Sequence, residues 1–195
     1  MTQVTRPTRT RRTAEDRRRQ LVGIGLRMLT TRPIHDITVD DVAAEAGIAR
    51  SLLFHYFPTK QDFYVEVVRA AGRRMLRATR VDPDTPGPAR LRAIVEGYIA
   101  FLTRRRTQYV GLFRAGGQGD WVRAVHDETQ TALTERTLDA LGLTDPDEVV
   151  ELSVRAWWAF AEELTIEWTG RARTDRDVLV ELLLSTLDGL VSRSR

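Results

Sequence analysis

The sequence predicts an all-α protein, and three observations support this prediction. Hydrophobic residues recur at helical spacing along most of the 195 residues. A Thr-x-x-Asp pattern, which is typical of a helix start, precedes four of these runs, at Thr13, Thr38, Thr59 and Thr174. No run alternates with a period of two or ends in a hairpin turn. We therefore expect about nine helices and no sheet.

The composition is that of a globular protein, with 42% hydrophobic and 29% charged residues. No apolar run approaches the roughly 18 residues of a membrane span, and no signal peptide is recognisable. The absence of cysteine excludes disulfides, cysteine-ligated zinc and cysteine nucleophiles. We expect a cytoplasmic protein without a membrane partner.

Charge divides the chain into a basic and an acidic part. Residues 1–80 contain 16 Lys/Arg and 8 Asp/Glu (+8), whereas residues 81–195 contain 14 and 19 (−5). A basic N-terminal part favours an anionic partner such as nucleic acid, because clustered cations gain affinity by releasing counterions. The alternative is a solvated arginine-rich surface, since Lys60 is the only lysine and codon usage can raise the arginine count.

Residues 1–12 are expected to be a flexible basic arm, because they contain four arginines and no acid. Such an arm can lie in a minor groove of DNA, or it can be a disordered tail. Both alternatives stay open from the sequence.

Residues 13–60 are expected to form a three-helix domain that contains a helix-turn-helix. The expected helices are 13–31, 38–45 and 49–56. Pro33 breaks the first helix, and Gly47 suits a left-handed turn between the other two. Pro58 ends the third helix because proline biases the preceding residue away from helical geometry.

Residues 61–195 are expected to form a second helical domain, which shares the long helix that begins at Thr59 and runs to about Arg80. The Pro/Gly-rich stretch 81–88 (VDPDTPGP) then interrupts the helical pattern. The further helices expected are 89–106, 107–114, 121–142, 146–169 and 175–192. The pair Asp145-Pro146 predicts the start of the fourth of these, with proline at the first position.

The last two expected helices, 146–169 and 175–192, are hydrophobic over more than half of their circumference. A helix of this kind must be covered on several sides. We therefore expect a homodimer in which these helices form a four-helix seam with a second copy. The alternative is that both helices are central in the monomer.

The segment GIARSLLFHYFPTK (47–60) separates into two faces when it is drawn as a helix. Leu53 and Phe57 share the side that packs against the domain, whereas Arg50, Ser51, Phe54 and His55 form a different face. Arginine binds guanine in a bidentate manner, serine binds several base edges, and phenylalanine contacts the thymine methyl group. The residues expected at phosphates are His55, Tyr56, Thr59 and Lys60.

The stretch ITVDDVAAEAGIARSLLFHYFPTKQDFYVEVV (37–68) resembles the TetR family of transcriptional repressors. Its residues fit the family pattern T-x-x-x-(I/V)-A-x-x-A-G-(V/I), followed by Y-x-(Y/H)-F-x-x-K. The matching positions are Thr38, Val42, Ala43, Ala46, Gly47, Ile48, Leu53, Tyr56, Phe57 and Lys60. The resemblance is strong over residues 14–68. It implies an N-terminal DNA-binding domain and a C-terminal helical ligand-binding and dimerisation domain.

Three residues depart from the family pattern. Ala49 stands where the family usually has a capping Ser or Thr, and Leu52 stands where a small polar residue is common. Phe54 replaces a tyrosine whose hydroxyl can touch DNA. The predicted DNA-binding residues are Thr38, Ala49, Arg50, Ser51, Leu52, Phe54, His55, Tyr56, Thr59 and Lys60.

The distal domain is rich in aromatic residues, and the resemblance implies a ligand pocket there. The candidate lining residues are Tyr98, Phe101, Tyr109, Phe113, Trp121, His126, Trp157 and Glu163. The alternative for each aromatic residue is ordinary core or dimer packing.

An enzyme is not expected, nor a cofactor or metal. The three histidines are not at metal-ligand spacing, and no catalytic motif is present. Glu162 and Glu163 diverge by about 100° on one helix, so they cannot act as a paired acid and base.

The sequence thus predicts a homodimeric, sequence-specific regulator that binds a quasi-palindromic operator in double-stranded DNA. We expect a repressor released by a small, largely apolar effector, as the family resemblance implies. The alternative is a ligand-independent DNA-binding dimer or an activator.

Overall fold

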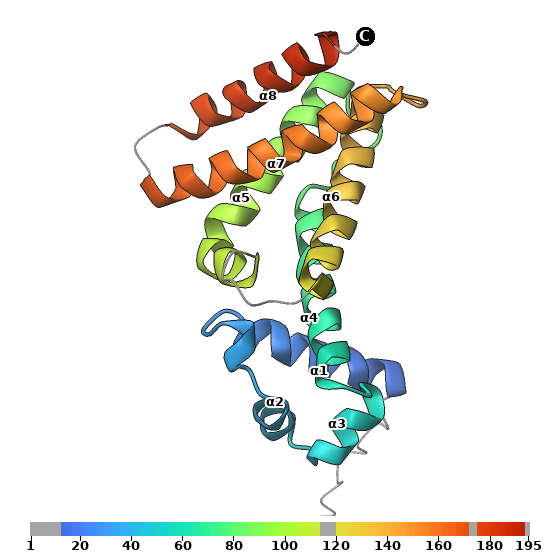
Figure 1. The fold of residues 1–195 in the computed structure, drawn as a ribbon, viewed down its shortest axis with the longest axis vertical. Coiled ribbons are helices and arrows are strands. Elements are labelled where there is room, and N and C mark those ends of the chain that lie inside the picture. The colour runs from blue at the N-terminus through green and yellow to red at the C-terminus, as the bar shows by residue number, and fades with distance from the viewer. Residues whose placement is uncertain (1–12, 114–119, 172–174, 194–195) are drawn as a thin grey trace, which may run out of the picture.

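The computed structural model describes residues 13–113, 120–171 and 175–193. Over these ranges the chain forms eight α-helices and a 3-10 turn, η1, with no strand, which confirms the all-α prediction. The elements are α1 (Ala14–Met28), η1 (Ile34–Asp36), α2 (Val39–Ala46), α3 (Arg50–Tyr56), α4 (Lys60–Ala78), α5 (Gly87–Phe113), α6 (Asp120–Ala140), α7 (Glu148–Arg171) and α8 (Arg176–Arg193). Figure 1 shows α1–α3 at one end of the molecule, α5–α8 at the other, and α4 joining the two.

Three of the four predicted helix starts are complete capping boxes. The hydroxyls of Thr13, Thr38 and Thr59 each accept the backbone N–H of the aspartate three residues later, at 3.1 Å. The bonds from Thr38 also lower the pKa of Asp41. Thr174 lies outside the described residues.

The corner between α2 and α3 has the geometry that the glycine predicted. Gly47 is left-handed (φ 62°, ψ 41°), and the N–H of Ile48 returns to the carbonyl of Ala43. Ala49 precedes α3 without a side-chain cap, as the sequence indicated. Phe57 is extended (φ −135°) and ends α3 before Pro58. The direction of α3 is therefore set by its turns and its packing.

The N-terminal core joins α1–α3 to the first half of α4. Leu53 and Phe57 are fully buried in this core, together with Phe63 of α4. The close crossing of α1 and α4 depends on Gly25, because a Cβ there would lie 2.6 Å from Cγ2 of Val67. Helices α1–α3 are thus fixed to the base of α4.

The C-terminal core is built from α5–α8 around two adjacent tryptophans. Nε1 of Trp157 donates to the Leu183 carbonyl at 3.0 Å, and Nε1 of Trp158 donates to Oγ1 of Thr137 at 3.0 Å. Both indoles are buried, so these bonds satisfy donors that would otherwise be costly. The pair ties α7 to α8 and to α6.

The predicted boundary between helices 89–106 and 107–114 coincides with a kink in α5, where Arg105 leaves helical geometry (φ −133°, ψ 22°) and two helical segments meet without a loop. With these segments counted as one element, the described residues hold eight helices where about nine were expected. The expected start of the following long helix was wrong by two residues. α7 begins at Glu148 and not at Pro146, because Asp147 accepts the N–H of Val150 at 2.9 Å.

None of the described helices combines the length and the apolar character needed to cross a bilayer.

Candidate DNA-binding surface and ligand cavity

The exposed face of α3 contains the residues expected to meet DNA. Arg50, Ser51 and His55 are exposed, and Phe54 is half-buried against the N-terminal core. Leu52 is 38% exposed, a large apolar side chain left open on this face. A helix with a buried side and a polar and apolar outer side suits the major groove.

Arg50 is held by an acidic neighbour in this structure. Its Nη1 lies 3.0 Å from Oδ2 and 3.3 Å from Oδ1 of Asp40, in the first turn of α2. Its guanidinium also lies over the ring of Phe54, at 5.5 Å from the centroid. Asp40 was not among the residues that sequence reasoning selected.

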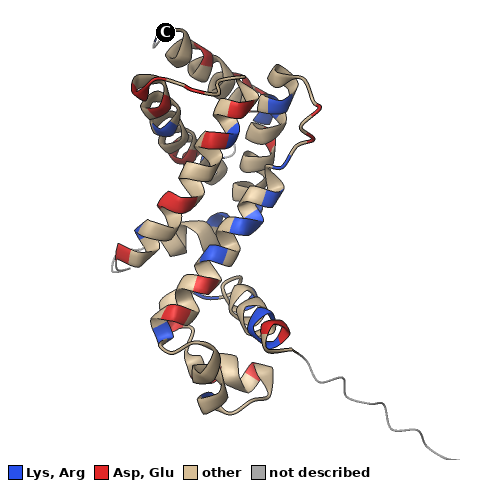
Figure 2. Ribbon diagram, turned by 90° about the vertical axis from the view of Figure 1, so that its right-hand side faces the viewer, with Lys and Arg blue, Asp and Glu red and all other residues tan. Residues whose placement is uncertain are grey.

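The other predicted contacts surround the recognition helix. Ala49 precedes it, half-buried Tyr56 ends it, and exposed Thr38 caps α2. Thr59 and Lys60 are exposed at the start of α4, with Nζ of Lys60 5.1 Å from the Tyr64 ring centroid. Helix starts favour phosphate oxygens. Figure 2 shows further basic residues in a series along α4.

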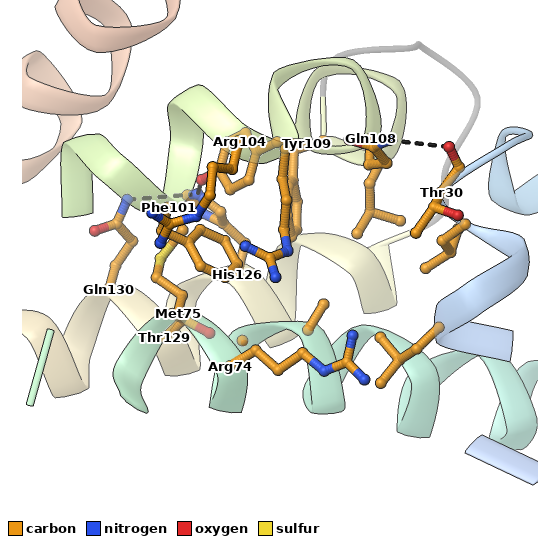
Figure 3. Close-up of a pocket in the computed structure, with 17 residues that line it drawn as sticks. Thr30, Arg74, Met75, Phe101, Arg104, Gln108, Tyr109, His126, Thr129 and Gln130 are labelled. Atoms are coloured by element: carbon orange, nitrogen blue, oxygen red, sulfur yellow. Dashed lines mark hydrogen bonds between the residues drawn. The ribbon is translucent and has the colours of Figure 1, made fainter. Parts of the chain in front are cut away.

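A cavity of about 380 Å³ lies where α1, α4, α5 and α6 meet. Its size is within the usual range of small-molecule sites. The apolar lining residues are Leu26, Leu29, Ala71, Met75, Phe101, Leu112 and Phe113. The polar lining residues are Thr30, Arg74, Arg104, Arg105, Gln108, Tyr109, His126, Thr129 and Gln130. Figure 3 shows side chains from all four helices directed toward this space.

Four of the eight predicted ligand-binding residues line the cavity: Phe101, Tyr109, Phe113 and His126. The others have different surroundings. Tyr98 packs against Trp158, Trp121 stacks beside Tyr64, and Trp157 bonds to α8. Glu163 is exposed on α7.

A polar network lies beside the cavity and involves Glu162, the residue that precedes Glu163 on α7. Nε2 of His126 lies 2.8 Å from Oε2 of Glu162 and 3.2 Å from the hydroxyl of Tyr109. Nε2 of Gln130 donates to the same carboxylate oxygen at 2.7 Å. Burial, with nearby Tyr98 and Glu162, raises the pKa of Tyr109 well above its ordinary value. These polar groups fix the wall formed by α6.

Sequence reasoning missed the three arginines of the cavity. Arg104 and Arg105 belong to the run TRRRT (103–107), and Arg74 lies on α4. A triple arginine inside an otherwise amphipathic helix was the available signal. The lining residues at the end of α1 and just after it, above all Thr30, carry no such signal because only the tertiary fold brings them to the cavity.

A helix-turn-helix with an exposed recognition face, joined by one long helix to a domain with a ligand-sized cavity, defines a DNA-binding transcriptional regulator. The protein-family model described as "Bacterial regulatory proteins, tetR family" matches residues 24–67. A second family model, described as "Tetracyclin repressor-like, C-terminal domain", matches residues 88–188, which is more than half of the chain. The chain belongs to the TetR family of transcriptional regulators. Members of this family are DNA-binding transcription factors and not enzymes, as the sequence predicted.

Curated relatives match part of the chain. The chain is 42% identical to the regulator EthR of Mycobacterium tuberculosis over 57 residues, which are 27% of this chain and 26% of EthR. It is 27% identical to the transcriptional activator FasR of Mycolicibacterium smegmatis over 130 residues, 65% of this chain and 58% of FasR. The chain therefore spans only a quarter to three-fifths of these two relatives.

Solved structures extend the similarity over nearly the whole fold. A tetR-family regulator from Streptomyces coelicolor superposes with a TM-score of 0.78 at 28% identity, covering 94% of this chain and 83% of that one. A putative transcriptional regulator from Pseudomonas aeruginosa PAO1 gives a TM-score of 0.70 at 23% identity, covering 98% and 100%. The second likeness concerns the fold alone.

Proposed function

We propose that the protein is a homodimeric repressor that leaves its operator when a small molecule occupies the cavity between α1, α4, α5 and α6. Each protomer places α3 in the major groove of one half of a quasi-palindromic site, with the half-sites about one helical turn or a multiple apart. The DNA contacts are the residues predicted from the sequence, on residues 13–60. The dimer contacts lie on residues 61–195, and the effector contacts lie on the same part together with the end of α1 and the residues after it. The protein acts in the cytoplasm, where bacterial DNA is found.

The observation that supports release is the composition of the cavity wall. Leu26, Leu29 and Thr30 belong to the end of α1 and the residues after it, in the DNA-binding part, whereas Phe101 and His126 belong to the distal part. A ligand in this space contacts both parts at once. It changes operator affinity to the extent that it binds more tightly to the arrangement in which the two α3 helices do not match the operator.

One hydrogen bond crosses the same junction. Nε2 of Gln108 on α5 donates to the carbonyl of Thr30 at 3.0 Å, beside the cavity (Figure 3). Because this bond joins the DNA-binding part to the distal part, a ligand that displaces Gln108 changes the position of α1 relative to α5. This gives the cavity a direct path to the helix that packs against α3.

Dimerisation is supported by apolar side chains on the last two helices. Large hydrophobic residues between 41% and 59% exposed occur on α7 and α8: Val149, Leu152, Phe160, Val178, Leu182 and Leu190. Among the described residues, the other exposed large hydrophobic side chain is Leu52 of α3. Apolar exposure gathered on two helices indicates a protein interface, and a second copy supplies a matching pair.

An activator is the second candidate. It is favoured by FasR, named an activator, which aligns with this chain over the longer of the two stretches described above. The basic arm predicted at residues 1–12 lies outside the described residues, and it is compatible with a repressor and with an activator.

A promoter fusion in a heterologous bacterium separates these candidates. The operator is first selected from random DNA with the purified protein and then placed at a reporter promoter. Repression that small molecules relieve supports the proposal, and reporter levels that rise with the regulator support the activator. Retained repression under every compound that binds the cavity would show a ligand-independent dimer. The variant Ala71→Trp, which fills the cavity, is the matched control for effector response.

A further inference from the structure

Three arginines from two helices converge on the cavity. Arg74 projects from α4, and Arg104 and Arg105 project from α5 (Figure 3). Arg74 and Arg105 are half-buried, while Arg104 is exposed at the rim. Among the residues that the structure describes, no carboxylate lies within 4.0 Å of any of the three guanidiniums. Some of the other arginines, such as Arg69 with Glu128, have acidic partners.

The guanidiniums are near enough to affect one another. Burial lowers the pKa of Arg105, and the positive charges of Arg104 and Arg74 lower it further. Arg105 is also the residue at which α5 leaves helical geometry, and its Cζ lies 4.6 Å from the centroid of the Phe101 ring. The kink therefore coincides with a cation placed over an aromatic wall of the cavity.

The remainder of the wall contains both apolar and neutral polar side chains. Leu26, Met75 and Phe113 contribute apolar side chains from three helices. A site that combines clustered cations with an apolar surface is complementary to a molecule with an anionic end and an apolar body. Oε1 of Gln130 is buried and has no hydrogen-bond partner among the described residues, so it suits a donor group on the body of such a molecule.

We propose that the cavity binds an amphipathic anion, an oxyacid such as a carboxylate or sulfonate attached to an aromatic or aliphatic group, with its charge among Arg74, Arg104 and Arg105. A neutral ligand leaves these cations unpaired, and a cationic ligand meets their repulsion. The statement that this ligand is the effector rests on the proposed function, whereas the inference that the cavity binds it does not. The bent α5 and the enclosing helices exclude a duplex of nucleic acid as the occupant.

The anion also gives a physical reason why ligand binding would be coupled to the DNA-binding part. Arg74 lies on α4, the helix whose first turn holds Thr59 and Lys60, while the other two arginines lie on α5. Without a ligand, like charges oppose a closer approach of the two helices. A bound anion removes this repulsion and draws α4 and α5 together.

Two fluorescent probes that differ by the anionic group test the inference. They are 1-anilinonaphthalene-8-sulfonate and its uncharged analogue N-phenyl-1-naphthylamine, titrated into the full-length protein. We expect the sulfonate to bind at least about tenfold more tightly than the analogue, because a charge-assisted contact with arginine is worth that much. The double variant Arg74→Gln/Arg105→Gln should abolish the preference and leave the affinity of the neutral probe within about twofold.

Controls locate the site and guard against misfolding. Ala71→Trp should weaken both probes because it fills the cavity, whereas Arg73→Gln, next to Arg74 but exposed and outside the cavity lining, should change neither. If the double variant does not fold, Arg104→Gln at the rim should still lower sulfonate affinity about threefold. The inference is overturned by equal affinity for the two probes or by failure of both to bind. It is also overturned by a preference that survives in the double variant, by sulfonate affinity that Arg104→Gln leaves unchanged, or by probe binding that Ala71→Trp leaves intact.

Operator binding in the presence of each probe separates this inference from the proposed function. Arginine-dependent sulfonate binding without a change in operator affinity supports the anion site and contradicts effector release through it. Release of the operator by the neutral probe, together with sulfonate binding that does not depend on the arginines, supports release and overturns the anion site.

Discussion

The guanidinium of Arg50 is bonded to the carboxylate of Asp40, with Nη1 3.0 Å from Oδ2. Both side chains are well exposed, at 59% and 60%. The predicted base reader is therefore held on the protein surface by an exposed acid. We expect base reading by Arg50 to compete with this bond.

Replacing Asp40 by asparagine should strengthen DNA binding. The change releases Arg50 and removes a negative charge near the predicted DNA contacts. Because an exposed ion pair is worth roughly 0.2–1 kcal/mol, we expect affinity to rise by a factor of about 1.4 to 5. Fluorescence anisotropy with labelled operator measures this change. In the background of Arg50→Ala the gain from the loss of the ion pair should disappear, which a double-mutant cycle detects.

The matched control for Asp40 is Glu45→Gln. Glu45 is an exposed acid of the same helix, paired with Arg27 at 3.5 Å rather than with a predicted DNA contact. Equal gains from Asp40→Asn and Glu45→Gln would show a general charge effect and no specific role for the bond to Arg50.

Arg50 and Lys60 should differ in how their loss affects DNA binding. Arg50→Ala should cost about 1–3 kcal/mol on the operator and relax base choice at one position, because it removes a base contact. Lys60→Ala should weaken all sequences alike and reduce the slope of log affinity against log salt by about 1, because it removes a phosphate contact. Titrations at several salt concentrations, with operator and scrambled DNA, compare the two. Identical sequence profiles for the two variants would refute the division into base reader and phosphate contact.

The N-terminal domain was largely predictable because its constraints are local. Gly47 supplies a positive φ that few other residues adopt, and Pro58 ends a helix wherever it occurs. The spacing of Leu53 and Phe57 then determines which side of α3 is buried, and both are fully buried. These effects act over a few residues, so the sequence contains them directly.

The cavity was only partly predictable because long-range packing selects its lining. Trp157 and Phe101 look alike in sequence, yet the former bonds to α8 and the latter faces the cavity. Adjacent Glu162 and Glu163 differ in burial only because one side of α7 meets α6. Nothing local distinguishes such pairs. The sequence of α5 predicts two helical segments, but it does not indicate that the kink at Arg105 turns this side chain toward the cavity.

Replacing Phe54 by tyrosine tests the departure of α3 from the family pattern. Phe54 is half-buried, with the guanidinium of Arg50 over its ring, and tyrosine restores the hydroxyl that the family pattern has at this position. We expect operator affinity to improve by about 0.5–1.5 kcal/mol, the net worth of one hydrogen bond to DNA. Anisotropy measures the affinity, and thermal unfolding should be unchanged. Weaker binding would show that the apolar ring itself is required.

A charge on the exposed face of α8 should separate the dimer. Leu182→Glu places a carboxylate among the exposed apolar residues of α7 and α8, and burial of an unpaired charge opposes association. Sedimentation should give a monomer, with operator affinity reduced at least about tenfold because one half-site is lost. Ala124→Glu, at an exposed site on α6, is the control and should remain dimeric. A dimeric Leu182→Glu would place the interface elsewhere.

Three glycines of the N-terminal domain should respond differently to the same methyl group. Gly47→Ala should destabilise by about 1–2 kcal/mol, since its φ of 62° is unfavourable for alanine although no atom lies within 4 Å of the new Cβ. Gly23→Ala, inside α1 with equally open space, should stabilise by about 0.5–1 kcal/mol because alanine favours helix. Gly25→Ala should destabilise by about 1–3 kcal/mol, because its Cβ would lie 2.6 Å from Val67 and 2.9 Å from Phe63. Urea unfolding measures all three, and a Gly47→Ala variant as stable as Gly23→Ala would contradict the left-handed corner before α3.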